Sequence, residues 1–299
     1  MFVCLLFTPK NLILGQQYVV ESPDDNLIGD HEDKLPSEET AALSVQENVG
    51  ESLANESLIP TSTEPTINTT KNKTIFVITP TYTRPTQMAD MTKLAQTLEV
   101  AALKYKINMH WIVSEDSTHL NPQVTALLNR TCIPSVQLLG PRPATHLDKR
   151  SGRGVSNRLK ALEWLRDTYT NTSQEGVIYF ADDDNSYDAR VFEVMRETQK
   201  VSVWPVGLIA KLGVSSPIIK EGKIVGFHDP YINRRKFAVD MAGFAADLQL
   251  FLKNPKATMP YKVGYEEDFF IRSLGVKIAD LEVKAKNCTE VSLLIPLSL

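Results

Sequence analysis

Apolar and polar positions follow two alternating periods from residue 74 onward. The run TIFVIT at 74–79 is apolar and β-branched and stops at Pro80, which predicts a buried strand. The stretch 85–105 then carries apolar side chains at helical spacing, which predicts an amphipathic helix. The pattern repeats as strands at 109–116, 135–141 and 176–184 and helices at 121–129, 154–169 and 188–199. This alternation predicts βαβ units and an α/β fold with a mostly parallel sheet.

Residues 201–299 show more turns and fewer clear helices, which predicts a second, smaller half packed on the first. The stretch 266–275 is the exception, a short predicted helix closed by Gly275. The sequence thus predicts a globular domain at 74–299, with halves at 74–200 and 201–299.

The first 73 residues have a different composition. Residues 21–73 are acidic at first and then rich in Ser, Thr, Asn and Pro, without a sustained apolar period. Such a segment buries too little apolar surface to offset its ordering entropy, so we interpret it as a stalk. The apolar start at 1–20 is broken by Pro9 and Lys10 and falls short of the roughly 20 apolar residues of a spanning helix. It is expected to be a truncated membrane anchor or a disordered start.

Charge, cysteine content and glycosylation acceptors narrow the class of protein. The net charge of −4 argues against general nucleic-acid binding. Three cysteines without a Cys-x-x-Cys pair exclude a disulfide scaffold and a cysteine zinc knuckle, and leave a Cys132–Cys288 pairing open. Asn-x-Ser/Thr acceptors occur at Asn55, Asn68, Asn72, Asn129, Asn171 and Asn287. Their number favours a lumenal location.

Three consecutive aspartates, Asp182 to Asp184, end the predicted strand VIYFADDD. Adjacent carboxylates repel, and a divalent cation removes that cost. Oxygen ligands suit Mg²⁺, Mn²⁺ or Ca²⁺ better than Zn²⁺. Tyr82 and Asp116 follow two other predicted strands. Because ligands of such sheets bind outside the carboxyl ends of the strands, we expect these residues to form one site.

Three other interpretations of the triplet fit the sequence less well. An EF-hand loop is rejected, because its sixth position needs glycine and here holds Tyr187, and because a strand precedes it. A phosphatase with an aspartate nucleophile remains a distant alternative. An acidic solvated turn fits less well directly after an apolar strand with polar residues at neighbouring strand ends.

Eight segments in this order and spacing carry a family resemblance: TPTYTR, HWIVSED, RGVSNRLKALEWLR, VIYFADDDNSY, VSVWPVGL, VGFH, VDMAGFA and NCTEV. From Thr74 to Val291 the chain resembles the animal β-1,3-glucuronyltransferases, glycosyltransferase family 43. The resemblance implies the GT-A fold, with a Rossmann-like nucleotide half and an acceptor half. It also implies inverting, Mn²⁺-dependent transfer of glucuronic acid from UDP-glucuronic acid to the 3-hydroxyl of a terminal β-galactose, on a proteoglycan linkage region or a glycoprotein glycan.

The same resemblance implies the site residues. The donor-binding positions are Pro80, Tyr82, Asp116, Arg153, Arg158, Asp182 and Asp183, the metal ligand is Asp184, the acceptor-binding positions are Arg235 and Asp240, and the catalytic base is Glu267. Tyr82 can stack on uracil and Asp116 can accept its ring N–H. Asp183 would take the ribose hydroxyls, while the part played by Asp182 stays open.

Plainer interpretations stand beside several of these roles. The two arginines could be a solvated helix face. Glu267, or its neighbour Glu266, could be an acid placed for the helix dipole. Asp240 could be structural, and Trp204 is expected in the core rather than under a sugar.

Two departures from the family pattern matter. An acidic acceptor-site position falls on Ser215, and no His or Arg follows Asn287, where the family has both. Loss of one electrostatic donor can cost ~10²–10³ in rate. The sequence therefore leaves a second hypothesis, a catalytically impaired UDP-sugar-binding member of the fold. The resemblance further implies a homodimer in the Golgi membrane with a lumenal catalytic domain.

Overall fold

The computed structural model describes residues 73–147, 152–208, 212–290 and 293–294. All of them belong to one compact unit, 65–299. The predicted anchor at 1–20 and the predicted stalk up to residue 72 lie outside the described residues. Within the described residues, no helix has the length and apolar character needed to cross a membrane.

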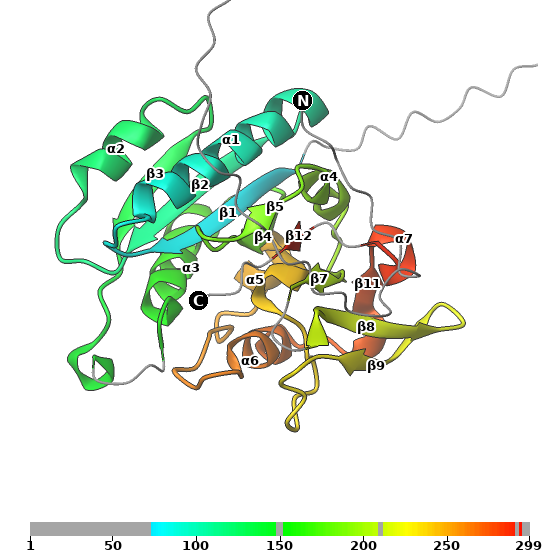
Figure 1. Ribbon diagram of the computed structural model, residues 1–299. Helices are drawn as coiled ribbons and strands as arrows, with labels where there is room; N and C mark the ends of the chain where they lie inside the picture. Colours follow the sequence, from blue (N-terminus) through cyan, green and yellow to red (C-terminus); the bar gives the residue numbers. More distant parts are fainter. Residues whose placement is uncertain (1–72, 148–151, 209–211, 291–292, 295–299) are drawn as a thin grey trace, which may run out of the picture. The chain divides into compact units, whose positions relative to one another are not determined.

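A seven-stranded sheet forms the centre of this part of the chain, in the order β11-β6-β10-β4-β1-β2-β3 (Figure 1). Its strands are β1 (Thr74–Thr81), β2 (Met109–Glu115), β3 (Ser135–Leu139), β4 (Gly176–Phe180), β6 (Val201–Val203), β10 (Phe244–Asp247) and β11 (Leu281–Val283). The pairings β4-β1, β1-β2, β2-β3 and β6-β11 are parallel, and β10 runs antiparallel to both of its neighbours. The predicted α/β class with a mostly parallel sheet is thus confirmed, as are its first four strands.

Helices cover both faces of this sheet. They are α1 (Gln87–Tyr105), α2 (Pro122–Leu128), α3 (Val155–Tyr169), α4 (Arg190–Arg196), α5 (Leu248–Lys253), α6 (Glu266–Ser273) and α7 (Ala285–Cys288), with 3-10 turns η2 (Ala144–His146), η4 (Met241–Gly243) and η5 (Ile278–Asp280). In β1, Ile75 and Val77 join the core under α1, α2 and α4, while Phe76 and Ile78 join the core under α3, α5 and α6. Because side chains alternate along a strand, a continuous apolar run serves two cores.

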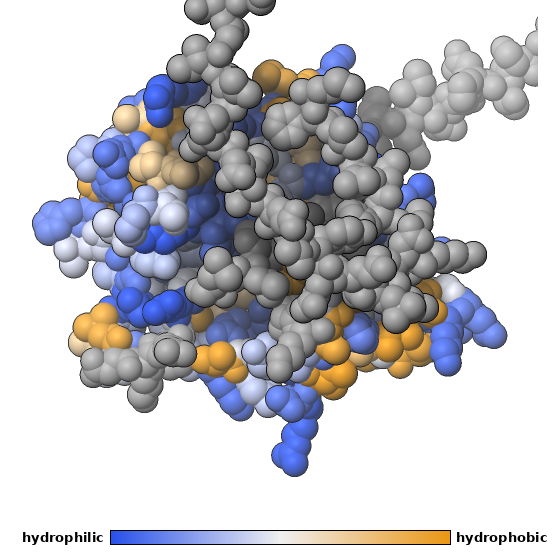
Figure 2. All heavy atoms as spheres, viewed as in Figure 1, coloured by the Kyte–Doolittle hydropathy of each residue, from blue (hydrophilic) through white to orange (hydrophobic). Residues whose placement is uncertain are grey.

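A smaller sheet has the order β5-β12-β7-β8-β9. Its strands are β5 (Ser186–Tyr187), β7 (Val206–Gly207), β8 (Val214–Lys220), β9 (Lys223–His228) and β12 (Leu293–Leu294). On the face seen in Figure 2, hydrophobic surface gathers over the β8–β9 hairpin, where Ile218 and Val225 are exposed. The larger sheet draws strands from both sides of residue 200, because β6, β10 and β11 come after it. The two predicted halves therefore share one sheet.

The reversed direction of β10 places the chain just before it at the carboxyl end of β4. Ala245 of β10 pairs with Tyr179 of β4. The Tyr179 hydroxyl and the Trp204 indole Nε1 both donate to the Ala242 carbonyl, each at 3.1 Å. Trp204 is buried in the core, as predicted. Cys132 and Cys288 are both free, so the disulfide that the sequence left open is not formed.

Candidate active site

The carboxyl ends of β4, β1 and β2 lie side by side and carry the predicted donor residues. Thr81 at the end of β1 pairs with Glu115 at the end of β2. The Ala181 amide, just past β4, donates to the Ile78 carbonyl of β1 at 2.8 Å. Tyr82, Asp116 and the aspartate triplet therefore follow adjacent strands at one edge of the sheet, as the sequence predicts.

Each aspartate of the triplet has a different environment. Asp182 forms an ion pair with Arg158 of α3. Asp183 is buried, accepts from the Thr81 hydroxyl at 2.6 Å and pairs with Arg84 Nη1 at 2.8 Å. Asp184 is exposed and makes no ion pair with any residue that the structure describes. Two arginines therefore neutralise two of the three carboxylates and leave the third for a ligand.

The electrostatics of Asp184 favour a bound cation. Although the residue is exposed overall, partial desolvation of its carboxyl raises the pKa above the usual range. The Asp182 and Asp183 carboxylates raise this pKa further, and Arg84 opposes them. Across the described ranges, no three His, Cys, Asp or Glu residues cluster closely enough to hold a metal by themselves. A single protein carboxylate supplemented by substrate phosphates and water is a coordination typical of Mg²⁺ and Mn²⁺. The residues present therefore fit a cation that Asp184 shares with a bound diphosphate.

Arg158 is positioned by the start of α3. Gly154 precedes the helix at φ 73°, and a Cβ there would lie 2.6 Å from Arg158 Nη1 and 3.5 Å from Pro80 Cβ. The guanidinium therefore lies against the glycine beside Pro80. Its Nε is buried and has no hydrogen-bond partner among the described residues. The solvated-face interpretation is wrong for Arg158, whereas Arg153 is exposed and its donor role stays a prediction.

Tyr82 and Asp116 have partners of their own at this edge. Asp116 accepts from the Arg142 backbone amide at 2.9 Å and from its Nε at 2.6 Å. Tyr82 is 46% exposed, and the Arg84 guanidinium carbon lies 4.9 Å from its ring centroid. The ring is thus held from one side by a cation–π contact and offers remaining surface for stacking.

Asp240 connects the two sides of the site. Its carboxylate caps η4 by accepting from the Ala242 amide at 2.9 Å, so the structural role predicted for it is real. Burial raises its pKa to about 6, with contributions from the Asp182 and Asp229 carboxylates and an opposing one from Arg158. These interactions reach the donor pair Arg158–Asp182 as well as the acceptor residues, so Asp240 lies between the two groups.

Glu266 and Glu267 begin α6 with different surroundings. Glu266 Oε2 accepts from the Tyr265 amide at 2.9 Å, which is the helix-terminus role expected of one of the pair. Glu267 has a side chain that is 15% exposed, and its Oε2 is buried without a hydrogen-bond partner among the described residues. The helix-dipole interpretation therefore fits Glu266, while Glu267 points an unsatisfied oxygen into the site.

Glu267 also has the electrostatics of a proton acceptor. Burial raises the pKa of its carboxyl to about 8, and the carboxylates of Asp240 and Glu266 add to the rise. Arg235 opposes it from 3.6 Å, the distance between Nη1 and Oε2. A carboxyl tuned close to neutral pH is a usual feature of catalytic bases.

Arg235, a predicted acceptor-binding residue, is almost completely buried. Only 3% of its side chain is exposed, and it forms an ion pair with Asp229. Its Nη1 also donates to the Val239 carbonyl at 3.3 Å. Ser215, which takes the family's acidic position, donates its hydroxyl to Asp229 Oδ2 at 2.5 Å. The carboxylate at this point is therefore Asp229, which follows β9, whereas β8 supplies the neutral Ser215.

Sequence reasoning missed Arg84, Arg142 and Asp229 as members of the site. Arg84 stands in the TPTYTR segment, so its place after β1 was the one available signal. Nothing in the pattern indicated that Arg84 reaches Asp183 across 99 residues, or that Arg142 reaches Asp116 across 26.

Comparison with known proteins decides the family. Residues 94–295 match the sequence profile of glycosyltransferase family 43. The chain belongs to this family. The match confirms the resemblance seen in the motifs, and with the topology above it confirms the predicted α/β fold of the GT-A type.

Two named relatives are more than two fifths identical to the chain over the aligned segment. It is 47% identical over 220 residues to galactosylgalactosylxylosylprotein 3-beta-glucuronosyltransferase P of Drosophila melanogaster, covering 73% of this chain and 44% of that one. It is 42% identical over 224 residues to the human 3-beta-glucuronosyltransferase 2, covering 73% and 67%. The chain thus spans about half the length of the Drosophila proteins it matches.

Among solved structures, Staphylococcus aureus TarS 1-349 in complex with UDP-GlcNAc matches with a TM-score of 0.47 at 15% identity, covering 74% of this chain and 58% of that one.

Proposed function

We propose that this family 43 chain transfers glucuronic acid from UDP-glucuronic acid to a galactose-terminated glycan. One observation carries the proposal: a buried carboxylate oxygen of Glu267 has no hydrogen-bond partner among the described residues and lies within electrostatic range of Asp240. Asp240 in turn is within range of Asp182 and Arg158 at the strand ends. A donor edge and a proton acceptor therefore share one site, on a chain whose relatives are named as 3-beta-glucuronosyltransferases.

The donor would lie along the carboxyl edge of β4, β1 and β2. Tyr82 stacks on uracil, Asp116 accepts the ring N–H, and Pro80 packs beside them. Asp183 accepts from the ribose hydroxyls, while Arg158 keeps Asp182 paired and offers the donor its Nε, which has no hydrogen-bond partner among the described residues. Asp184 would hold Mn²⁺, which when bound offsets the charge of the departing diphosphate.

The acceptor sugar would lie between Asp240 and Glu267. Glu267 accepts the proton of the galactose 3-hydroxyl as that oxygen bonds to the anomeric carbon of the donor. The bond from this carbon to the diphosphate oxygen breaks in the same step, and UDP leaves with the electron pair. A single displacement of this kind inverts the anomeric configuration. Asp240 orients the acceptor, and Arg235 supports the wall behind Glu267.

The wider setting is part of the same proposal. The six Asn-x-Ser/Thr acceptors support a lumenal location, for which the Golgi membrane is the proposed site. A homodimer is proposed from the family resemblance alone. No observation on the described residues favours the impaired alternative.

Transfer of labelled glucuronic acid tests the proposal. The full chain is incubated with radiolabelled UDP-glucuronic acid, a β-galactoside and Mn²⁺, and the product is digested with β-glucuronidase. We expect a labelled product that the digestion releases, and none when β-glucose replaces galactose. UDP binding by calorimetry without any product would instead support the impaired alternative, and a folded chain that binds no UDP would reject both.

A further inference from the structure

A single buried cation, Arg235, lies between two carboxylates that come from different elements. Asp229 directly follows β9, and Glu267 is in the first turn of α6. The exposed fractions of the Arg235 and Asp229 side chains are 3% and 4%. A charge so far from water depends on its neighbours for compensation. Whether Arg235 pairs with Asp229 or with Glu267 therefore influences the ionisation of both carboxyls.

Asp229 holds Arg235 by a complete set of contacts. It forms the ion pair with Arg235 Nη2, accepts the Ser215 hydroxyl at 2.5 Å and accepts the Tyr231 amide at 2.8 Å. These contacts use both oxygens of the carboxylate, and with only 4% of its side chain exposed Asp229 is poorly accessible to a substrate. Asp229 therefore reaches Glu267 through the arginine.

Arg235 consequently makes only a long contact with Glu267. The Nη1 atom that faces Glu267 already donates to the Val239 carbonyl at 3.3 Å and stays 3.6 Å from Glu267 Oε2. That separation is longer than a hydrogen bond. Glu267 Oε2 has no hydrogen-bond partner among the described residues, although a guanidinium lies next to it.

We propose that Asp229 is a positioning residue that keeps Arg235 committed to itself and so leaves Glu267 free to accept the acceptor's proton. The inference rests on the proposed function and adds a residue that lies outside the family's motifs in this sequence. An arginine released from Asp229 would turn to Glu267, pair with it and hold it as a weakly basic carboxylate.

The charges around Glu267 all point to the same outcome. Arg235, Asp240 and Glu266 face it, and Asp229 acts from behind Arg235. Neutralising Asp229 removes one negative charge and frees one positive charge, and both changes favour ionised Glu267. Asp240 does not compensate, because with a pKa of about 6 it is already ionised where Glu267 titrates.

The experiment is a carboxyl titration of the full chain by ¹³C NMR, with Glu267 assigned from the signal lost in Glu267→Gln. In Asp229→Asn we expect the Glu267 midpoint to fall by about one pH unit or more, the usual effect of an opposite charge at close range. The acidic limb of kcat/KM should move down by the same amount, with a lower plateau because the base is weaker.

Matched variants separate positioning from simple damage. Asp229→Glu keeps the charge and should restore the wild-type midpoint, and Ser215→Ala removes a neutral hydrogen bond to the same carboxylate and should leave the midpoint in place. Asp229→Ser removes the charge with less bulk and should reproduce Asp229→Asn. An unmoved midpoint in either folded charge-removing variant, or activity lost equally at every pH, would overturn the inference. Absent transfer by wild type would contradict the proposed function alone, since the NMR titration needs no turnover.

Discussion

At the scale of single residues, three adjacent aspartates have three different tasks. Arg158 neutralises Asp182, while Arg84 and Thr81 fix Asp183 inside the fold. Asp184 keeps its carboxylate exposed and without an ion pair among the described residues. Identical side chains thus differ in how their charge is neutralised, because their surroundings differ.

Substitution should separate these tasks. Asp183→Asn leaves the buried side of Arg84 without its carboxylate, so we expect the free energy of unfolding to fall by about 1–3 kcal/mol. Asp184→Asn should change it by less than about 0.5 kcal/mol, as is usual for exposed positions, but abolish Mn²⁺-dependent UDP binding. Urea unfolding and calorimetry measure the two effects. Equal stability losses in both variants would contradict the assignment.

Glu267 makes a second prediction at this scale, on stability against pH. Its pKa is about 8 in the folded chain against an ordinary 4.5, so the folded state binds the proton more tightly. Its contribution to stability is complete below pH 4.5 and is lost as the pH rises through 8. Glu267→Gln should therefore gain stability over wild type at pH 8.5, on the order of a few kcal/mol, because one pKa unit is worth about 1.4 kcal/mol. Urea midpoints at pH 5 and 8.5 test this, and a difference that does not change with pH would refute it.

At the scale of elements, the start of α3 shows how a turn positions a charge. Gly154 has φ 73°, a conformation in which a side chain is strained, and Arg158 lies where its Cβ would be. The direction of a strand positions Asp240 on the acceptor side. Because β10 is antiparallel to β4, the residues just before it, including Asp240, lie at the carboxyl end of β4. Backbone direction and a missing Cβ thus position two of the site's charges.

Gly154→Ala tests the first of these devices. The new methyl group would lie 2.6 Å from Arg158 Nη1, which must move and weaken its contact with the donor. We expect UDP affinity to fall about tenfold or more, since charge-assisted hydrogen bonds are the strong ones. Gly222→Ala in the β8–β9 turn is the control, because it has φ 73° and no atom within 4 Å of the added Cβ. Gly222→Ala should leave UDP affinity unchanged, and equal UDP affinity of the two variants in calorimetry would count against the proposed role of Arg158.

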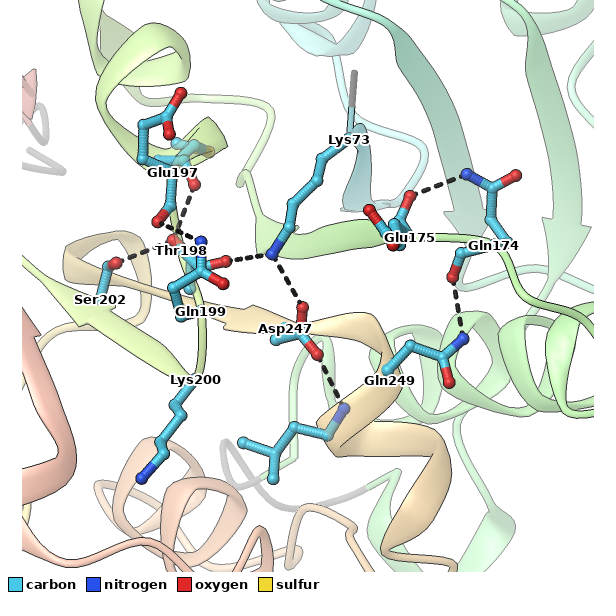
Figure 3. Close-up of polar contacts among 12 residues, drawn as sticks. Lys73, Gln174, Glu175, Glu197, Thr198, Gln199, Lys200, Ser202, Asp247 and Gln249 are labelled. Atoms are coloured by element: carbon cyan, nitrogen blue, oxygen red, sulfur yellow. Dashed lines mark hydrogen bonds and ion pairs between the residues drawn. The ribbon is translucent and has the colours of Figure 1, made fainter. Parts of the chain in front are cut away.

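At the scale of the whole described unit, the two ends of the strands in the larger sheet have different roles. The carboxyl edge bears the candidate site. At the opposite edge, just before β1, Lys73 donates to the Thr198 carbonyl at 2.6 Å and pairs with Asp247 at 3.1 Å (Figure 3). Asp247 also caps α5 by accepting from the Leu250 amide at 2.9 Å. This network joins the start of β1 to the end of β10 and the approach to β6.

Lys73→Met should therefore affect stability alone. Its ion pair is largely buried, with side chains 14% and 13% exposed, so we expect a loss of about 1–3 kcal/mol and an unchanged kcat/KM. Lys200→Met is the matched control in the same region: its pair with Asp280 has side chains 55% and 30% exposed, and it should change stability by less than about 0.5 kcal/mol. Thermal melts and transfer assays measure the outcome. A drop in kcat/KM for Lys73→Met would show that the two edges are coupled.

Local periodicity was enough to predict the strands from β1 to β4, the helices between them and the edge at which Tyr82, Asp116 and the triplet meet. The reason is that side chains alternate on a strand and recur every 3.6 residues on a helix. Buried apolar positions therefore recur along the sequence with the period of the element. The motif set also identified the family, because eight segments in the same order and spacing are far more specific than any one of them.

Only the tertiary structure decided which charges neutralise each other. Arg84 and Asp183 are 99 residues apart, and Arg235 and Glu267 lie on different elements, so no sequence period links them. It also separated Glu267, whose buried Oε2 has no hydrogen-bond partner among the described residues, from Glu266, which accepts from the Tyr265 amide at the helix start. Sequence places residues on strand ends by local pattern, whereas pairing, desolvation and basicity depend on distances that exist only after the chain has folded.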